Sequence, residues 1–208
     1  MENGHTLNTR TGAGNMKNER KPILLVIAGP NGSGKSTITG WFDIVGEYTN
    51  ADEMVAATGM SNLDAAVLAD QRRYAAIERH ADLTFETVLS SEYKLEIVRK
   101  AKAEGYFIKG VFVLTTDPKI NKSRVKSRVA DGGHDVDESK ITARYYKSLG
   151  NVPELLSLCD ILHIYDNSDA LPFRIVRKHK ESLSIFPCSY WSEERILALI
   201  GMSPGNGK

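Results

Sequence analysis

The sequence predicts an α/β fold built on a parallel sheet of about five strands. Short apolar runs such as Ile23–Ala28 alternate along the chain with segments of helical periodicity, and this first run is apolar at every position. A strand without polar alternation is typical of a sheet buried on both faces. Strands that alternate with helices form βαβ units, and such units give parallel strands.

The remaining elements follow in chain order. A helix should begin at Lys35, directly after the first strand, and a short second strand is expected over 47–51. The later expectations are a helix over 63–81 capped by Ser61 or Asn62, a strand over 83–87, a helix over 92–104 capped by Ser91 and stopped by Gly105, a strand over 107–114, helices over 118–130 and 138–149 with Asp137 as cap of the second, a short helix over 153–158, a last strand over 161–165 and a helical segment over 192–200.

Composition and charge narrow the class of protein. The chain has 208 residues, 41% of them hydrophobic, which suits one domain with a real core. The 27 Lys and Arg nearly balance the 26 Asp and Glu, so the total charge makes nucleic acid or an acidic membrane an unlikely class of partner. The first apolar run is far shorter than the roughly 20 residues of a membrane span. We expect a cytoplasmic protein with a disordered leader over 1–20, one domain over 21–202 and a loose tail over 203–208.

One motif carries chemistry on its own. Residues 29–36 (Gly-Pro-Asn-Gly-Ser-Gly-Lys-Ser) fit the Walker A pattern G-x-x-x-x-G-K-[ST] at each fixed position, between the first strand and the first helix. Glycines let the backbone turn N–H groups inward, where they and the helix N-terminus attract phosphate oxygens. Lys35 should reach the outer phosphates of ATP, and the Ser36 hydroxyl should bind Mg²⁺. The expected nucleotide-binding residues are Gly29, Asn31, Gly32, Ser33, Gly34, Lys35, Ser36 and Thr37.

Missing signatures narrow the reaction. The chain has no Asn-Lys-x-Asp triplet for guanine, since residues 121–124 end in Arg, and no Leu-Ser-Gly-Gly-Gln signature. No strand of four apolar residues ends in Asp-Glu, as a helicase or an ATPase motor would show. These absences favour a small P-loop kinase that transfers a phosphoryl group to a small acceptor.

Two carboxylates follow predicted parallel strands. Asp52 comes after the second strand and Glu86 ends the third, and ligands of open α/β sheets bind at the carboxyl ends of the strands. Phosphoryl transfer needs a carboxylate that orients or accepts the proton of the acceptor. A helix cap for Asp52 and a solvated strand end for Glu86 remain the structural alternatives.

The arginines after residue 118 suggest a helical lid. Arg124 and Arg128 share one face of a predicted helix, the glycines of 132–133 and His134 break it, and Arg144 lies in the next helix. A lid arginine can neutralise the charge of the transferring phosphoryl group. The alternative is a pair of solvated helices, because several lysines lie on them too.

Three features outside these motifs have a structural and a functional interpretation. Asn167 follows the last strand and either contacts the nucleotide base or is simply a turn residue. The basic run 174–180 is interpreted as a solvated face, with an RNA contact as the alternative. Of the two cysteines, Cys159 precedes an apolar strand and should be a buried hydrophobe.

Taken together, the segments 28–37, 50–53, 85–87 and 128–145 resemble the zeta-toxin family of P-loop kinases. The resemblance implies a P-loop sandwich with a helical lid. In it, Asp52 would be the base toward the acceptor hydroxyl, Glu86 and Thr87 would bind the acceptor, and Arg128 and Arg144 would act on the phosphates. Arg124 and His134 of the lid region are further candidates for substrate contact, and Asn167 is one for the nucleotide.

The resemblance also implies a reaction. Characterised members use ATP and Mg²⁺ to phosphorylate the sugar of UDP-N-acetylglucosamine, and they are toxins of toxin–antitoxin pairs whose helical antitoxin blocks the nucleotide site. Two other readings stay open at this point. The acceptor could instead be a nucleoside, a sugar, an antibiotic or an RNA end, or the chain could be a nucleotide-dependent binding switch that performs no transfer.

Overall fold

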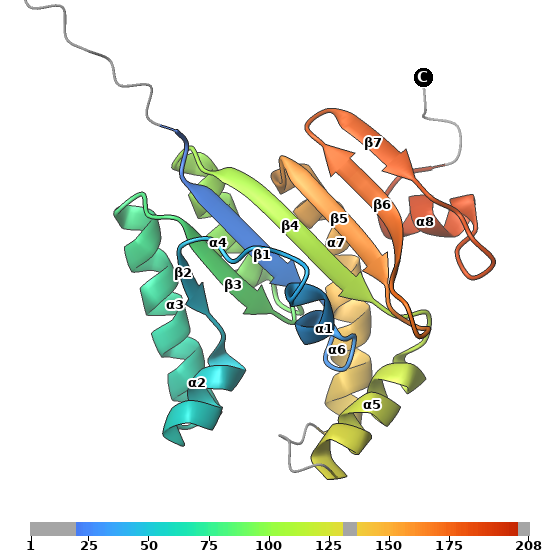
Figure 1. Ribbon diagram of the computed structural model, residues 1–208, viewed down its shortest axis with the longest axis horizontal. Helices are drawn as coiled ribbons and strands as arrows, with labels where there is room; N and C mark the ends of the chain where they lie inside the picture. Colours follow the sequence, from blue (N-terminus) through green and yellow to red (C-terminus); the bar gives the residue numbers. More distant parts are fainter. Residues whose placement is uncertain (1–19, 131–136, 204–208) are drawn as a thin grey trace, which may run out of the picture.

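The computed structural model describes residues 20–130 and 137–203, and its centre is one seven-stranded sheet (Figure 1). The strands lie in the order β2-β3-β1-β4-β5-β6-β7. Their bounds are Ile23–Ala28 for β1, Glu47–Thr49 for β2, Leu83–Thr87 for β3, Phe107–Leu114 for β4, Ile161–Asp166 for β5, Phe173–His179 for β6 and Ser182–Ile185 for β7.

The first five strands form the parallel sheet that the sequence predicts. β1 pairs in parallel with both β3 and β4, so the phosphate loop that follows β1 leaves from the middle of the sheet. β2 extends the sheet beside β3, and β5 extends it beside β4. Ala28 is in register with Thr87 of β3, which places the ends of these two neighbouring strands at the same edge. That edge is where a ligand of an open α/β sheet binds.

The last two strands were not predicted. β6 and β7 form a hairpin that adds to β5 in antiparallel fashion, and β6 contains most of the basic run 174–180. The interpretation of this run as a solvated face was therefore incomplete. Ile175 and Val176 are fully buried while Arg177 is exposed, and the Lys178 ammonium donates to the Leu156 carbonyl of the helix layer, so the cations of this strand lie on both sides of the sheet.

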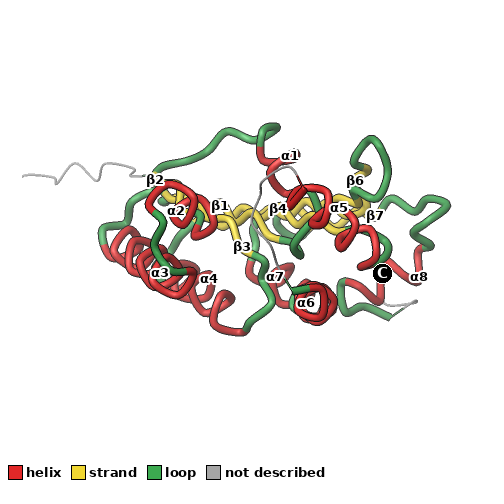
Figure 2. The backbone as a smooth tube through the Cα atoms, turned by 90° about the horizontal axis from the view of Figure 1, so that it is seen from below, coloured by secondary structure: helices red, strands yellow, loops and turns green. Residues whose placement is uncertain are grey.

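The helices lie mostly on one side of the sheet. Figure 2 shows α3, α4, α6 and α7 below the sheet and α1 above it. The helix bounds are Lys35–Thr39 for α1, Ala51–Thr58 for α2, Asn62–Glu78 for α3, Glu92–Ala103 for α4, Pro118–Ala130 for α5, Glu138–Gly150 for α6, Val152–Leu158 for α7 and Glu193–Leu199 for α8. Most ends agree with the sequence prediction to within a few residues, but α2 was missed.

Local capping explains where several helices begin. Ser61 accepts a hydrogen bond from the Asp64 N–H at the start of α3, and Asp137 accepts one from the Ser139 N–H at the start of α6, as the sequence predicts. Ser91 occupies the N-cap position of α4, but its side chain makes no capping hydrogen bond. The glycine hinge proposed for the lid lies at 132–133, outside the described residues.

The core lies mainly between the sheet and the lower helices. It joins buried strand residues such as Phe85 and Phe112 to helix residues such as Leu95 and Ile196. A smaller cluster around Ile38 packs α1 on the other side of the sheet. Among the described residues, no helix is long and apolar enough to span a membrane.

Candidate active site

The loop between β1 and α1 has the backbone shape that its sequence predicts. Gly29, Gly32 and Gly34 have φ values of 146°, 73° and 88°, in the region that favours glycine. A Cβ atom on Gly34 would lie 2.0 Å from the Asn167 amide nitrogen, and one on Gly29 would lie 2.0 Å from the Val113 carbonyl oxygen. These positions therefore require glycine for space as well as for conformation.

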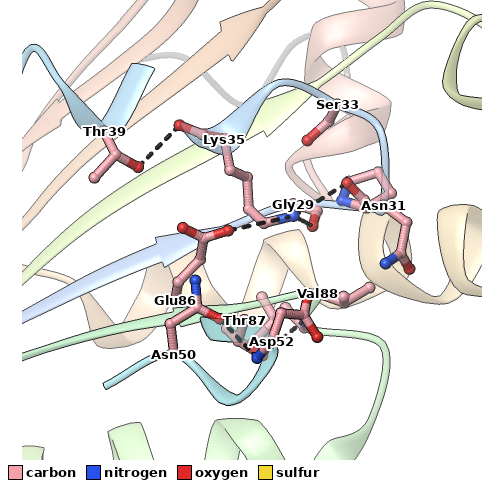
Figure 3. Close-up of polar contacts among 12 residues, drawn as sticks. Gly29, Asn31, Ser33, Lys35, Thr39, Asn50, Asp52, Glu86, Thr87 and Val88 are labelled. Carbon is pink, nitrogen blue, oxygen red and sulfur yellow. Dashed lines mark hydrogen bonds and ion pairs between the residues drawn. The ribbon is translucent and has the colours of Figure 1, made fainter. Parts of the chain in front are cut away.

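Lys35 turns back over this loop. Its ammonium donates to the carbonyl oxygens of Gly29 at 2.8 Å and Pro30 at 3.2 Å, and lies 4.0 Å from a carboxylate oxygen of Glu86 (Figure 3). Burial lowers the pKa of Lys35, while the charges of Glu86 and Asp52 oppose that change. A buried cation with few fixed partners is suited to pairing with a phosphate group.

Two buried asparagines hold the loop from behind. The Asn121 amide on α5 donates to the Asn31 carbonyl at 2.6 Å, and Asn121 also accepts from the Thr115 hydroxyl. The Asn167 amide after β5 donates to the Ser33 carbonyl at 2.8 Å. Asn167 therefore lies against the back of the loop, a contact that neither sequence interpretation, the nucleotide base or a simple turn, had named. Asn121 was not singled out, because it contacts a segment 90 positions away in sequence.

The two predicted carboxylates lie beside this loop. Asn50 caps α2 by accepting from the Asp52 N–H at 3.0 Å, so Asp52 is the second residue of α2 and not its cap. Glu86 points from β3 toward Lys35, above Asn50 and Asp52 in Figure 3. Burial raises the pKa of Glu86, and the charge of Lys35 acts in the opposite direction. Glu86 is thus a half-buried carboxylate and not the solvated strand end that was its alternative.

Tyr48 lies between Glu86 and Glu53. Its hydroxyl lies 3.3 Å from Glu86 and 3.1 Å from Glu53, and it accepts from the Asn50 amide at 3.2 Å. A tyrosine hydroxyl has one hydrogen to donate, so it serves one carboxylate at a time. Burial raises the pKa of Tyr48, which keeps this hydrogen in place at neutral pH.

A buried ion network supports the same region from below. Arg73 of α3 is 2% exposed, and its guanidinium donates to the Thr49 hydroxyl at 2.9 Å and to Asp70 at 2.8 Å. It also lies over the Phe85 ring, 4.5 Å from the centroid. The Lys94 ammonium of α4 donates to both Asp70 oxygens, at 2.7 and 2.6 Å. This network fixes the end of β2, and therefore the start of α2 that carries Asp52.

An open cleft of about 390 Å³ joins these parts. Its lining includes Lys35, Asp52, Glu86, Thr87, Arg128 and Arg144 of the predicted site, together with Asn31. It also includes residues that the sequence analysis had not placed in a site, among them Asn50, Arg73, Ser91, Lys94, Asp137 and Lys140. The structure thus brings the phosphate loop, both carboxylates and two lid arginines to one cavity.

The other predicted site residues lie around this cleft or outside the residues that the structure describes. Ser36 and Thr37 are exposed in the first turn of α1. Arg124 is half-buried on α5, where it donates to the Ser168 carbonyl at 3.4 Å beside the loop. The Thr87 hydroxyl accepts from the Leu89 N–H at 3.1 Å. His134 lies outside the described residues.

The polar groups of the loop fit a nucleotide. The side-chain oxygens of Asn31 and Ser33 and one guanidinium nitrogen of Arg124 are buried without a hydrogen-bond partner among the described residues. They lie on or beside a glycine-rich loop at the start of a helix, which attracts phosphate. No group of three His, Cys, Asp or Glu side chains that could hold a metal occurs in 20–130 or 137–203. Mg²⁺ needs fewer, because it keeps waters and binds substrate phosphates.

Comparison with known proteins identifies the family. Residues 46–175 match the model of the Zeta toxin family, a span that holds both carboxylates and the lid arginines. The chain belongs to the zeta toxin family. A relative from Haemophilus influenzae, an uncharacterised protein, is 29% identical over 123 residues, which are 56% of this chain and 88% of the relative.

Two solved structures share the fold of this chain. A chain of the AvrRxo1-ORF1:AvrRxo1-ORF2 complex superposes with a TM-score of 0.64 at 15% identity, covering 90% of this chain. The present chain spans only 65% of the length of that chain, and the complex is also known with ATP. A chain of the PezAT toxin–antitoxin system of Streptococcus pneumoniae superposes with a TM-score of 0.53 at 16% identity, covering 74% of this chain and 72% of that one.

Proposed function

We propose that this zeta toxin is an ATP- and Mg²⁺-dependent kinase that phosphorylates a hydroxyl group of a nucleotide sugar such as UDP-N-acetylglucosamine. The observation that carries the proposal is the single cleft in which Lys35 of the phosphate loop faces Asp52 and Glu86. The domain that performs the reaction extends over 21–202, and the protein acts in the cytoplasm, where ATP and nucleotide sugars are made.

The proposed mechanism begins with the phosphates. The loop amides and the Lys35 ammonium bind the β- and γ-phosphates of ATP, which requires Lys35 to exchange its carbonyl contacts for phosphate oxygens. The Ser36 hydroxyl would hold Mg²⁺, whose charge stabilises the phosphate oxygens when it is bound. Asn121 and Asn167 keep the loop in shape during this exchange.

The acceptor is activated on the other side of the cleft. Asp52 orients the acceptor hydroxyl and takes its proton as the hydroxyl oxygen bonds to the γ-phosphorus. The bond between that phosphorus and the bridging oxygen breaks, and ADP leaves with the electron pair. Glu86 and Thr87 position the acceptor, and Arg128 and Arg144 neutralise the transferred group, with Arg124 beside the loop as a further cation.

Transfer of labelled phosphate tests the proposal. Incubation of γ-labelled ATP and Mg²⁺ with UDP-sugars, free sugars, nucleosides, aminoglycoside antibiotics and RNA ends should label a UDP-sugar. Asp52→Asn should lose about 100-fold or more in rate, within the range of a positioned general base. Asp43→Asn is a matched control, because it makes the same change at an exposed acid that does not line the cleft. Unchanged turnover in Asp52→Asn would remove that residue from the mechanism.

If another acceptor is labelled instead, the protein is still a kinase, and only the proposed substrate is wrong. Tight ATP binding without any labelled product, in wild type and variants alike, would instead favour the nucleotide-dependent binding switch. As a toxin, the protein should arrest growth when expressed alone and be neutralised by a helical antitoxin that covers the nucleotide site. The likeness to a chain of the PezAT toxin–antitoxin system supports this part of the proposal.

A further inference from the structure

One half of the sheet face on the α1 side carries side chains that remain partly exposed. We call this surface the open face and define it by Lys109 of β4, His163 and Tyr165 of β5, and Arg174 and Arg177 of β6. Each of these residues is half-buried or exposed, whereas Leu162 and Ile164, which point to the opposite side of the same strand, are fully buried. Figure 2 shows α1 above the sheet and α3, α4, α6 and α7 below it.

The strand register brings these side chains into rows. His163 is in register with Val111 of β4 and with Arg177 of β6, and Tyr165 is in register with Arg174. Directly paired positions on neighbouring strands are close enough for their side chains to interact. The Arg174 guanidinium lies 3.5 Å from the His163 ring nitrogen and stands over the Phe186 ring, 5.3 Å from its centroid.

Aromatic rings gather on the same surface. The rings of His163 and Tyr165 are stacked with their centroids 6.2 Å apart, and the Trp41 ring meets Tyr165 edge-on at 6.2 Å. The centroid of the Phe42 ring lies 6.4 Å from the ring centroids of both His163 and Tyr165. Trp41 is 55% exposed although it is one of the largest apolar side chains of the protein. These neighbouring rings form a partly exposed aromatic cluster rather than one isolated exposed side chain, and clustered exposed apolar groups mark interaction sites.

The residues that define the open face include three cations and no carboxylate. The strands β4, β6 and β7 contain no Asp or Glu. The acidic residue of β5, Asp166, is 5% exposed and accepts a hydrogen bond from the buried Trp191 on the opposite side of the sheet. The net charge of +1 does not reveal this local group of cations. The total charge of the protein gives no sign of a nucleic-acid partner, but the cations gathered on the open face favour one.

We propose that the open face binds single-stranded nucleic acid. The exposed Trp41 ring and the half-buried rings beside it offer flat surfaces on which bases stack, and the cations beside them pair with the backbone phosphates. An acidic protein would use the cations and leave the rings without a matching partner, so the combination favours nucleic acid. The face lies on the far side of the sheet from α3 and α4, which line the cleft, and the proposal does not depend on the kinase reaction.

Fluorescence anisotropy with a labelled 12-nucleotide oligouridine tests the proposal. Binding to the full chain should have a Kd of roughly 1–100 µM in 50 mM salt, and three contacted cations give a log–log salt slope of about −2. Arg177→Ala should reduce that slope by about 0.7, which weakens binding about eightfold at this salt concentration. Trp41→Ala should weaken binding at least about fivefold. Both DNA and RNA of this length should bind, because stacking and phosphate contacts serve either.

Matched variants decide the outcome. Arg177→Lys keeps the charge and should bind like wild type, and Arg72→Ala removes an exposed cation from α3 on the other side of the sheet and should also change nothing. Binding should persist in Lys35→Ala and with saturating ATP. The proposal fails if no saturable binding occurs up to about 100 µM, if Arg177→Ala behaves like Arg72→Ala, or if polyglutamate of equal charge competes as well as the oligonucleotide does.

Discussion

Replacing Asp70 by asparagine should destabilise the protein by about 3 kcal/mol. Asp70 is 7% exposed and is the shared counter-charge of Arg73, at 2.8 Å, and Lys94, at 2.6 Å. Removing one partner of a buried ion pair costs about 3–5 kcal/mol, because the remaining charge has lost its compensation. The lower end applies here, since asparagine can still accept one hydrogen bond and the Lys94 side chain is 20% exposed.

This cost is large enough to measure. About 3 kcal/mol lowers the folding equilibrium constant roughly 150-fold and the Tm by about 6–12 °C for a chain of this size. Urea unfolding of wild type and variant gives the difference directly. Glu78→Gln serves as the control, because Glu78 is an exposed acid near the end of the same helix. Its unfolding free energy should stay within about 0.5 kcal/mol of wild type.

A second substitution separates the ion network from simple loss of packing. Lys94→Met removes one of the two cations that Asp70→Asn leaves without a counter-charge, so the double variant should lose less than the sum of the two single losses. A loss below about 1 kcal/mol in Asp70→Asn, or strict additivity of the two changes, would refute the argument that the buried charges depend on one another.

Three further predictions concern other parts of the structure. Gly34→Ala should weaken binding of a non-hydrolysable ATP analogue at least about tenfold, because its Cβ would lie 2.0 Å from a side-chain nitrogen. Gly105→Ala, with a similar φ of 81° and open space, should leave this binding unchanged and lower only the free energy of unfolding, by the roughly 1–2 kcal/mol of left-handed strain. Glu86→Gln should be at least as stable as wild type at neutral pH. Burial raises the pKa of Glu86 above 4.5, so the folded state holds the proton more tightly, and the wild type loses stability as the pH rises from 4.5 through the raised value. Unfolding curves of the variant across that pH range should lack this decline. A variant less stable than the wild type at pH 7 would contradict the prediction. Burial raises the pKa of the Cys159 thiol to about 12, so alkylation at pH 8 should modify only the other cysteine until the protein is unfolded, as mass spectrometry would show.

Much of the fold could be predicted because its signals are local. A strand buried on both faces is a continuous apolar run, and the run Ile23–Ala28 is β1 to the residue. The predictions for 83–87 and 107–114 also agree with β3 and β4 to the residue. The hairpin of β6 and β7 was missed for a local reason as well. Arg177 and its basic neighbours suggested a solvated segment, and only pairing with β5 shows that Ile175 and Val176 are buried within it.

The candidate site divides in the same way. The Walker A pattern and the rule that ligands bind at the carboxyl ends of parallel strands were enough to predict Lys35, Asp52 and Glu86 as neighbours. No sequence rule connects Arg73 with Thr49, which is 24 positions away, because the contact exists only after α3 has packed beneath β2. The same holds for Asn121 and the phosphate loop.

By itself, then, the sequence determined the parallel strands, the phosphate loop and the residue types beside it, because each depends on patterns within a few positions of the chain. The tertiary structure alone decided that β6 and β7 extend the sheet and that Asn167 supports the loop from behind. It also decided that cations and aromatic rings from β4, β5 and β6 share one open face. These features are contacts between distant segments, and their energy comes from burial and charge pairing that exist only once the sheet has formed.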